Sequence, residues 1–292
     1  MKKTIFIFVS IFLITQTFFL YGQGFPGAQG TNDPFSVMDK VFSDTEKTFT
    51  PEEEYYLGRA VAANILGVYK LYTQNTVLTR YLNNICQALA INSIMPEAYN
   101  GYYVMILDSR EFNAFATPGG HIFITKGLVE AATSEDALAA IIAHELAHIM
   151  LKHGIGLIAS MKTAEELDSI AQQSAAIAGR GNGESRNIQS FRNSISEFME
   201  IMLKNGYSQA QEFEADNTAI ELLVSAGYDP RGLLEALGVL QKAQRGQQGG
   251  LFSTHPAPSD RITNAQRLTV GIRPPDTQAA RKARFARIME NR

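Results

Sequence analysis

Apolar residues recur at intervals of three or four positions through most of the chain, a spacing typical of helices that bury one face. The segment 133–154 departs from this pattern because it is apolar on nearly every side. A helix of this kind is expected to lie inside a sizeable domain. Thr133 and Asp136 form a capping-box pattern at its start, and Gly154 is the residue expected just after its end.

Further helices are predicted where the same spacing follows a capping signal. Thr50, Pro51 and Glu53 begin one such helix, and Ser208 with Gln211 begins another. The further helices are predicted at residues 50–65, 75–90, 157–177, 188–203 and 208–226.

Short strands are predicted where β-branched and aromatic residues replace the helical spacing. They cover residues 102–108, 112–117 and 121–125, and Pro118-Gly119-Gly120 forms the turn between the last two. The third strand leads within ten residues into the 133–154 helix. The fold class is therefore predicted to be α+β, mostly helical, with a small sheet beside that helix.

Composition sets the outer bounds of the molecule. A chain of 292 residues that is 45% hydrophobic can bury a full core, as one large domain or two small ones. The formal net charge of −3 gives no indication of a nucleic-acid partner. Cys86 is the single cysteine, so no internal disulfide is possible, and its apolar helical surroundings predict a small core residue.

The N-terminus has the features of a targeting segment. Lys2 and Lys3 precede an apolar run from residue 5 to residue 20, which small residues around Gly22 follow. We expect residues 1–22 to be a cleaved signal peptide and 23–48 to be a linker, with a short helix near 37–42; an uncleaved membrane anchor is the alternative. No second run is long enough to span a bilayer, and no cysteine follows the first run to carry a lipid. These features predict an exported protein, periplasmic in a bacterium.

The 133–154 helix carries the sequence His144-Glu145-Leu146-Ala147-His148. Residues four apart share a helix face, so the two imidazoles can bind one metal ion. Glu145 lies beside them, where a carboxylate can take a proton from the attacking water without being a ligand. The alternative is a chance match with histidines of the core. Four of the five histidines in the chain fall within 33 positions, which argues against chance.

A third ligand is sought in the helix at 208–226. Glu212 and Asp216 lie four apart on one face, while Glu214 points about 200° away from Glu212. A carboxylate ligand with an acid one turn on, which holds a ligand histidine by its other nitrogen, fits a hydrolytic zinc site. Glu214 cannot share that face and is expected to be a solvated or structural acid. A plain acidic helix face is the alternative.

Three segments in order carry a resemblance to a known family: Asn113-Ala-Phe-Ala-Thr-Pro-Gly-Gly-His-Ile-Phe-Ile-Thr, HELAH followed by His153, and Tyr-Ser-x-x-x-Glu-x-Glu-Ala-Asp ending at Asp216. The sequence resembles the CAAX-prenyl-protease-related gluzincin metallopeptidases, and more closely their soluble exported branch, which includes periplasmic proteases that enhance β-barrel assembly. The resemblance covers about residues 50–268 and implies a zincin-type catalytic domain at 49–270.

The resemblance implies a role for each matching residue. His144, His148 and Glu212 would bind one Zn²⁺ per chain, Glu145 would be the general base, and Asp216 would hold a ligand histidine. The residues that would bind substrate beside the cleft are Asn113, Ala114, Phe115 and Ala116. His255, in a Ser-Thr-His-Pro element, would act in catalysis, as a fourth ligand that displaces water or as a donor to the oxyanion; the alternative is a turn residue. His121 and His153 are expected to have surface or structural roles.

The predicted function is that of a zinc metalloendopeptidase of the cell envelope that cleaves unfolded or misassembled proteins. A periplasmic chaperone or assembly factor for outer-membrane proteins, with gated or rare proteolysis, is the alternative. A structural zinc protein is weaker, because closed structural sites favour cysteine ligands. Residues 155–205 are expected to form a helical insert that covers the cleft. Residues 271–292 form a basic C-terminal tail, expected to be a solvated helix or else to touch the membrane or assembly machinery.

Overall fold

The computed structural model describes residues 49–161, 164–175, 185–244, 255 and 258–290. The predicted signal segment, the linker with its short helix, and residues 176–184 of the predicted insert lie outside these residues. The helices are α3 (Pro51–Val68), α4 (Thr76–Ala90), α5 (Lys126–Ala131), α6 (Glu135–Met150), α7 (His153–Met161), α8 (Ala164–Ala175), α9 (Ser185–Asn205), α10 (Gln209–Ser225), α11 (Gly232–Gln244), α12 (Pro258–Thr269) and α13 (Gln278–Met289). Within the described residues no single helix is long and apolar enough to cross a bilayer, and α6 with α7 passes that test only as a pair bent by 46°.

Side-chain caps set the start of the helices that the sequence predicts best. The Thr50 hydroxyl accepts a hydrogen bond from the Glu53 amide, while the Glu53 carboxylate accepts one from the Thr50 amide. Ser208 and Gln211 form the same reciprocal pair at the start of α10. Each pair satisfies amide groups that a helix start leaves without partners, so the capping boxes predicted at Thr50 and Ser208 are confirmed.

The sheet has three strands, β1 (Tyr103–Leu107), β2 (Ala114–Ala116) and β3 (His121–Thr125), in the order β1-β3-β2. β1 runs parallel to β3, and β2 runs antiparallel to β3 at the edge of the sheet. A short 3₁₀ turn, Pro118–Gly120, joins β2 to β3. Gly119 has φ of 74° there, and a Cβ atom on it would lie 2.4 Å from the Tyr55 Cα, so only glycine fits. The predicted small sheet is confirmed.

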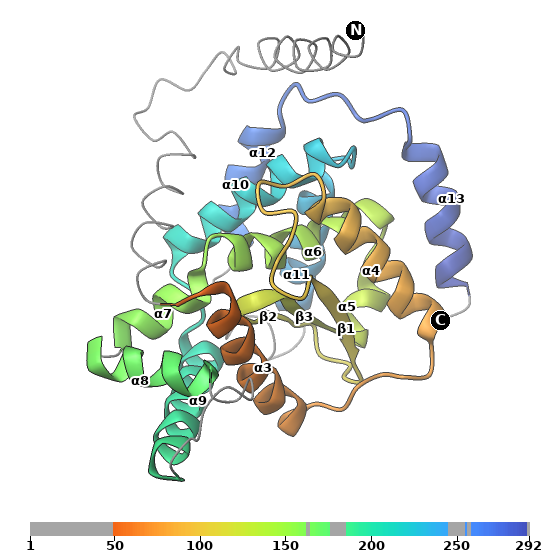
Figure 1. Ribbon diagram of the computed structural model, residues 1–292. Coiled ribbons are helices and arrows are strands. Elements are labelled where there is room, and N and C mark those ends of the chain that lie inside the picture. Colours follow the sequence, from red (N-terminus) through yellow and green to blue (C-terminus); the bar gives the residue numbers. More distant parts are fainter. Residues whose placement is uncertain (1–48, 162–163, 176–184, 245–254, 256–257, 291–292) are drawn as a thin grey trace, which may run out of the picture. The chain divides into compact units, whose positions relative to one another are not determined.

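Helix α6 lies between α10, α11 and the sheet (Figure 1), and all 16 of its residues are buried. Its ends differ from those predicted. Ser134, not Thr133, is the N-cap, and its hydroxyl accepts from the Ala137 amide at 3.0 Å. The helix ends at Met150, before Gly154, because Lys152 adopts the left-handed conformation with φ of 53°. The prediction of a fully buried helix is confirmed, and its predicted capping residues are wrong.

The predicted insert forms three helices, α7, α8 and α9. Both α8 and α9 pack on α3. Ile170 of α8 and Phe198 of α9 belong to the same buried apolar cluster as Leu57 and Val61 of α3. Helices α8 and α9 of the insert thus pack on α3. That the insert covers the cleft stays a prediction.

Helix α13 is attached to the start of α6 by arginines. The Arg281 Nε lies 2.8 Å from the Asp136 Oδ1, and the Arg284 Nε donates to the Glu135 Oε2 at 2.7 Å. Arg281 is only 4% exposed, whereas Lys282 beside it is exposed. The sequence predicts a solvated helix here, but one face of α13 is turned inward because two buried carboxylates of α6 attract its arginines.

Replacing Arg281 with alanine is expected to lower the free energy of unfolding by about 3 kcal/mol, because the Asp136 charge would stay buried without its main partner. Lys282→Ala, one residue on, is the matched control and should change the stability by less than about 0.5 kcal/mol. Urea denaturation measures both. Equal effects of the two substitutions would show that α13 contributes only weakly to the fold.

Candidate metal centre

Helix α6 presents three functional side chains together. His144 and His148 are four residues apart, and their Nε2 atoms lie 3.1 Å from each other. Glu145 is buried beside them, and its Oε2 has no hydrogen-bond partner among the described residues. Because α6 is buried on all sides, these polar groups face each other and not solvent. A buried polar group without a partner is unfavourable, so this arrangement needs a ligand to explain it.

Helix α10 packs against α6 and adds the carboxylate of Glu212. Its Oε2 lies 3.4 Å from the His144 Nε2, and its Oε1 lies 3.4 Å from the His148 Nε2. Tetrahedral zinc with bonds of about 2.0–2.1 Å needs ligand atoms that are about 3.3 Å apart. The two imidazoles and the carboxylate therefore already have the spacing and the atom types of a zinc site.

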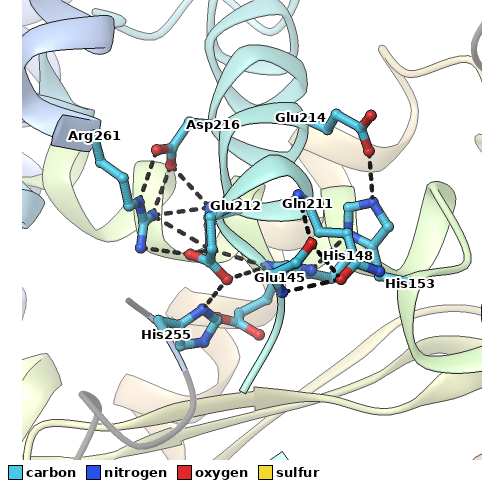
Figure 2. Close-up of polar contacts among 11 residues, drawn as sticks. Glu145, His148, His153, Gln211, Glu212, Glu214, Asp216, His255 and Arg261 are labelled. Atoms are coloured by element: carbon cyan, nitrogen blue, oxygen red, sulfur yellow. Dashed lines mark hydrogen bonds and ion pairs between the residues drawn. The ribbon is translucent and has the colours of Figure 1, made fainter. Parts of the chain in front are cut away.

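His255 is the fourth member of this group. Its Nδ1 lies 2.6 Å from the Glu212 Oε1, and its Nε2 lies 3.7 Å from the Glu145 Oε1. One ligand atom from each of His144, His148, Glu212 and His255 lies within 4.8 Å of the others, and all four residues are buried. The structure thus brings together the residues that the sequence predicts as ligands. Figure 2 shows His255 beside Glu212, where it closes the group.

Asp216 and Arg261 hold one side of the group in place. The Asp216 Oδ1 lies 3.1 Å from the His144 Nδ1, as the spacing on α10 predicts. Arg261, from α12, donates to both oxygens of Asp216 at 2.7 and 2.8 Å, and its Nη1 lies 2.6 Å from the Glu212 Oε2. The sequence marks Arg261 only as the residue that follows the His255-Pro256 element of the family resemblance, and the motifs assign it no chemical role.

The charges in the group decide its protonation. Burial opposes ionisation of Glu212, yet the charges of His255 and Arg261 hold its pKa well below the ordinary value. Burial lowers the pKa of His148 well below its ordinary value. Burial and the Arg261 charge lower the pKa of His144, but hydrogen bonds to Asp216 and Glu212 outweigh them and raise it to about 9. An ionised Glu212 and a neutral His148 are the forms that bind a metal ion, and a proton on His144 leaves when zinc binds.

The predicted substrate segment lies next to this group. Ala114 lines a cavity of about 30 Å³ together with His144, Glu145 and His255. Phe115 points to the other face of the sheet, where its ring lies 5.7 Å from that of Tyr69. Neighbouring residues of a strand alternate between faces, so only part of the predicted segment can face the site.

Of the segment's other two predicted residues, Ala116 lines a second small cavity beside His148. The Asn113 carbonyl accepts from the Thr125 amide at 3.0 Å. Substrate binding by all four residues stays a prediction.

Two histidines with no assigned role differ in position. The His121 ring stacks on that of Tyr55, with the ring centroids 5.4 Å apart. His153 is buried, and its Nδ1 lies 2.8 Å from the His148 Nδ1. The Tyr207 ring stacks on His148 at 4.1 Å on a nearly parallel plane. Sequence reasoning missed the contacts of His153 and Tyr207 with His148.

Comparison with known proteins agrees with this geometry. The model of peptidase family M48 matches residues 77–269, which include every member of the four-residue group. The chain belongs to peptidase family M48. This membership confirms the metallopeptidase class, the zinc requirement and the zincin-type fold that the motifs predict.

Individual relatives lie within the same class. The chain is 29% identical to metalloprotease LoiP of Escherichia coli over 187 residues, which cover 64% of this chain and 69% of that protein. It is 26% identical over 243 residues to a putative beta-barrel assembly-enhancing protease of Vibrio cholerae, covering 80% of this chain and 48% of the relative. It is 30% identical over 154 residues to mitochondrial metalloendopeptidase OMA1 of Schizosaccharomyces pombe, covering 51% of this chain and 41% of the relative. The M48 chain thus spans about half the length of several of its relatives.

Proposed function

We propose that this protein is a zinc endopeptidase of the bacterial cell envelope that cleaves unfolded or misassembled proteins, and that His255 keeps its site closed between cleavage events. The observation that carries the proposal is the buried His144–His148–Glu212 triangle, with Glu145 beside it and His255 in the fourth position. Three protein ligands and a carboxylate base are the equipment of a hydrolytic zinc enzyme.

Different residues of the site have different roles in peptide hydrolysis. Zinc, when bound, lowers the pKa of water and polarises the peptide carbonyl. Glu145 accepts the proton of the attacking water and passes it to the leaving amine. Burial raises the pKa of Glu145 above its ordinary range, which supports this double role because a stronger base accepts a proton more readily. Asp216 and Arg261 keep His144 and Glu212 in their positions throughout.

The closed arrangement supports gating by His255. Catalytic zinc sites keep one position open for water or substrate, whereas structural sites are closed by four protein ligands. The Nδ1 of His255 contacts the Glu212 carboxylate at 2.6 Å, so His255 must move before a peptide carbonyl reaches the site. An edge strand beside the site supports an extended substrate: a peptide can pair with β2 as one more strand. Folded proteins seldom offer such a segment, so unfolded chains are the expected substrates.

The envelope location rests on the signal-like pattern of residues 1–22 and on similarity to proteases named for β-barrel assembly. An N-terminal membrane anchor is the alternative to cleavage. Peripheral contact with the membrane or with assembly machinery belongs to the same proposal. The second candidate function, a chaperone or assembly factor with gated or rare proteolysis, is also favoured by the closed position of His255.

The proposal is tested with the wild type and His255→Ala, each loaded with zinc. The substrate is one disulfide-bonded protein, offered in its native form and in its reduced, carboxymethylated form. We expect the wild type to cut only the unfolded form and His255→Ala to cut that form severalfold faster, with one zinc still bound because three ligands remain. A chelator should stop both enzymes.

Each other outcome of this test has a definite meaning. Slower cleavage by His255→Ala would assign His255 to the oxyanion and overturn gating. Zinc-loaded protein of both kinds that leaves the unfolded form intact, yet prevents its aggregation, would favour the chaperone function. Cleavage of the native form would contradict selection for unfolded chains.

A further inference from the structure

His148 makes a contact through the nitrogen that faces away from the metal group. Its Nε2 faces His144 and Glu212, while its Nδ1 lies 2.8 Å from the Nδ1 of His153. Two ring nitrogens at this distance form a hydrogen bond only if one carries the proton and the other accepts it. The contact is therefore directional, and its direction decides which nitrogen of His148 is free to bind metal.

Glu214 sets that direction. Its Oε2 lies 3.3 Å from the Nε2 of His153. An ionised carboxylate only accepts, so in the neutral imidazole of His153 the Nε2 carries the proton and the Nδ1 has a free lone pair. The Nδ1 of His148 then donates to His153, which leaves the lone pair of the His148 Nε2 directed at Glu212 and His144. The carboxylate thus orients the distant imidazole through one intervening ring.

The outer nitrogen of His144 is also held by an acid, but without an intervening ring. Asp216 contacts the Nδ1 of His144 directly at 3.1 Å. Figure 2 shows Asp216 and Glu214 on opposite sides of α10. The orientation of Glu214 away from Glu212, which suggests a solvated acid in the sequence, is what brings it to His153. One helix therefore supplies the ligand carboxylate and an anchoring acid for each imidazole.

A backbone turn at Lys152 brings His153 next to the outer nitrogen of His148. After α6 ends, Lys152 adopts a left-handed conformation with φ of 53°, which is unfavourable for a residue other than glycine. The buried Lys152 Nζ lies 2.9 Å from the Glu54 Oε1 of α3, which holds this turn in place. The turn leads directly into α7, whose first residue is His153. Tyr207 covers the face of the His148 ring at 4.1 Å, so the ring is held at one edge and on one face.

We propose that His153 and Glu214 are positioning residues, which fix the tautomer and the orientation of His148 for zinc. This inference rests on the proposed assignment of His148 as a ligand. Partners that hold the outer nitrogen of a ligand histidine commonly change metal affinity by about 10–100-fold when removed. The expected effect is therefore on zinc affinity itself, in addition to any effect on cleavage.

The test is competition between the full-length protein and a zinc chelator of known affinity. His153→Ala and Glu214→Ala should each weaken zinc binding by about tenfold. Glu214→Gln, which keeps an acceptor oxygen, should lie between Glu214→Ala and the wild type. The matched controls are His121→Ala and Glu221→Ala; the His121 ring stacks on Tyr55, Glu221 is an exposed acid of α10, and neither should change the affinity.

A double variant separates a relay from two independent structural effects. If Glu214 acts only through His153, the His153→Ala, Glu214→Ala double variant binds zinc no more weakly than His153→Ala alone. Additive losses would overturn the relay, and so would unchanged affinity in both single variants. Thermal unfolding of the metal-free forms completes the test. A fall in melting temperature with wild-type zinc affinity would mean a purely structural role.

The variant His148→Ala tests separately whether His148 is a zinc ligand. His148→Ala should lose far more affinity than either positioning variant. If His148→Ala bound zinc like the wild type, the ligand assignment itself would be wrong. If His148→Ala lost zinc while His153→Ala and Glu214→Ala kept wild-type affinity, only the positioning role would fail.

Discussion

Glu145→Gln is expected to bind one zinc per chain and to cleave an unfolded protein about 10³-fold more slowly than the wild type. Zinc should stay because the four residues whose ligand atoms converge are His144, His148, Glu212 and His255, without Glu145. Cleavage should fall because an amide cannot accept the proton of the attacking water. The measurement is kcat/KM on a carboxymethylated protein, alongside the zinc content of the same sample.

Glu145→Gln removes the charge of the side chain while nearly keeping its size. The amide has nearly the same volume as the carboxylate, so the buried site should keep its packing, and the unfolding transition should change little. Full activity in this variant would overturn the assignment of Glu145 as the base. If wild type and variant protect an unfolded β-barrel protein from aggregation equally well, the chaperone function would exist beside the peptidase function. Protection that disappears with the carboxylate would link it to cleavage.

Local signals in the sequence predicted most of the framework of the site. The capping boxes at Thr50 and Ser208 are local interactions, since each involves residues three apart, and both are present. The inward arginines of α13 were not predicted, because Arg281 differs from an exposed arginine only through Asp136, which is distant in the sequence. A contact of that kind is decided by tertiary packing, which the helical spacing of the segment does not encode.

Within the metal group, too, contacts between residues near each other in the sequence were predictable, and contacts set by tertiary packing were not. His144 and His148 could be placed together from helix geometry alone, whereas Glu212 lies 64 residues after His148 and was singled out with the help of a family resemblance. His153 was missed for a backbone reason. Gly154 is the expected helix stop, but the chain turns at Lys152, a residue that seldom adopts a left-handed conformation. A turn one residue before His153 changes where that imidazole points, and no sequence pattern signals it.

Glu212→Ala is expected to weaken zinc binding by more than about 100-fold, beyond the range for residues that only orient a ligand. Each oxygen of Glu212 lies 3.4 Å from a histidine Nε2, so the carboxylate supplies one corner of the ligand triangle. Its loss also leaves the Arg261 guanidinium, now 2.6 Å from Glu212, beside the position of a divalent cation. Repulsion between the two positive charges adds to the loss of a ligand.

Alanine substitutions of three acids of α10 are expected to weaken zinc binding to three different degrees. Glu212→Ala should lose stoichiometric zinc, Glu214→Ala should bind about tenfold more weakly than the wild type, and Glu221→Ala should be unchanged. All three substitutions remove one negative charge from the same helix, so a general electrostatic effect on zinc would make them similar. Chelator competition on the three variants separates these cases. Retention of one zinc per chain by Glu212→Ala, with loss in Glu214→Ala, would instead make Glu214 the third ligand and require α10 to turn in the metal-bound protein.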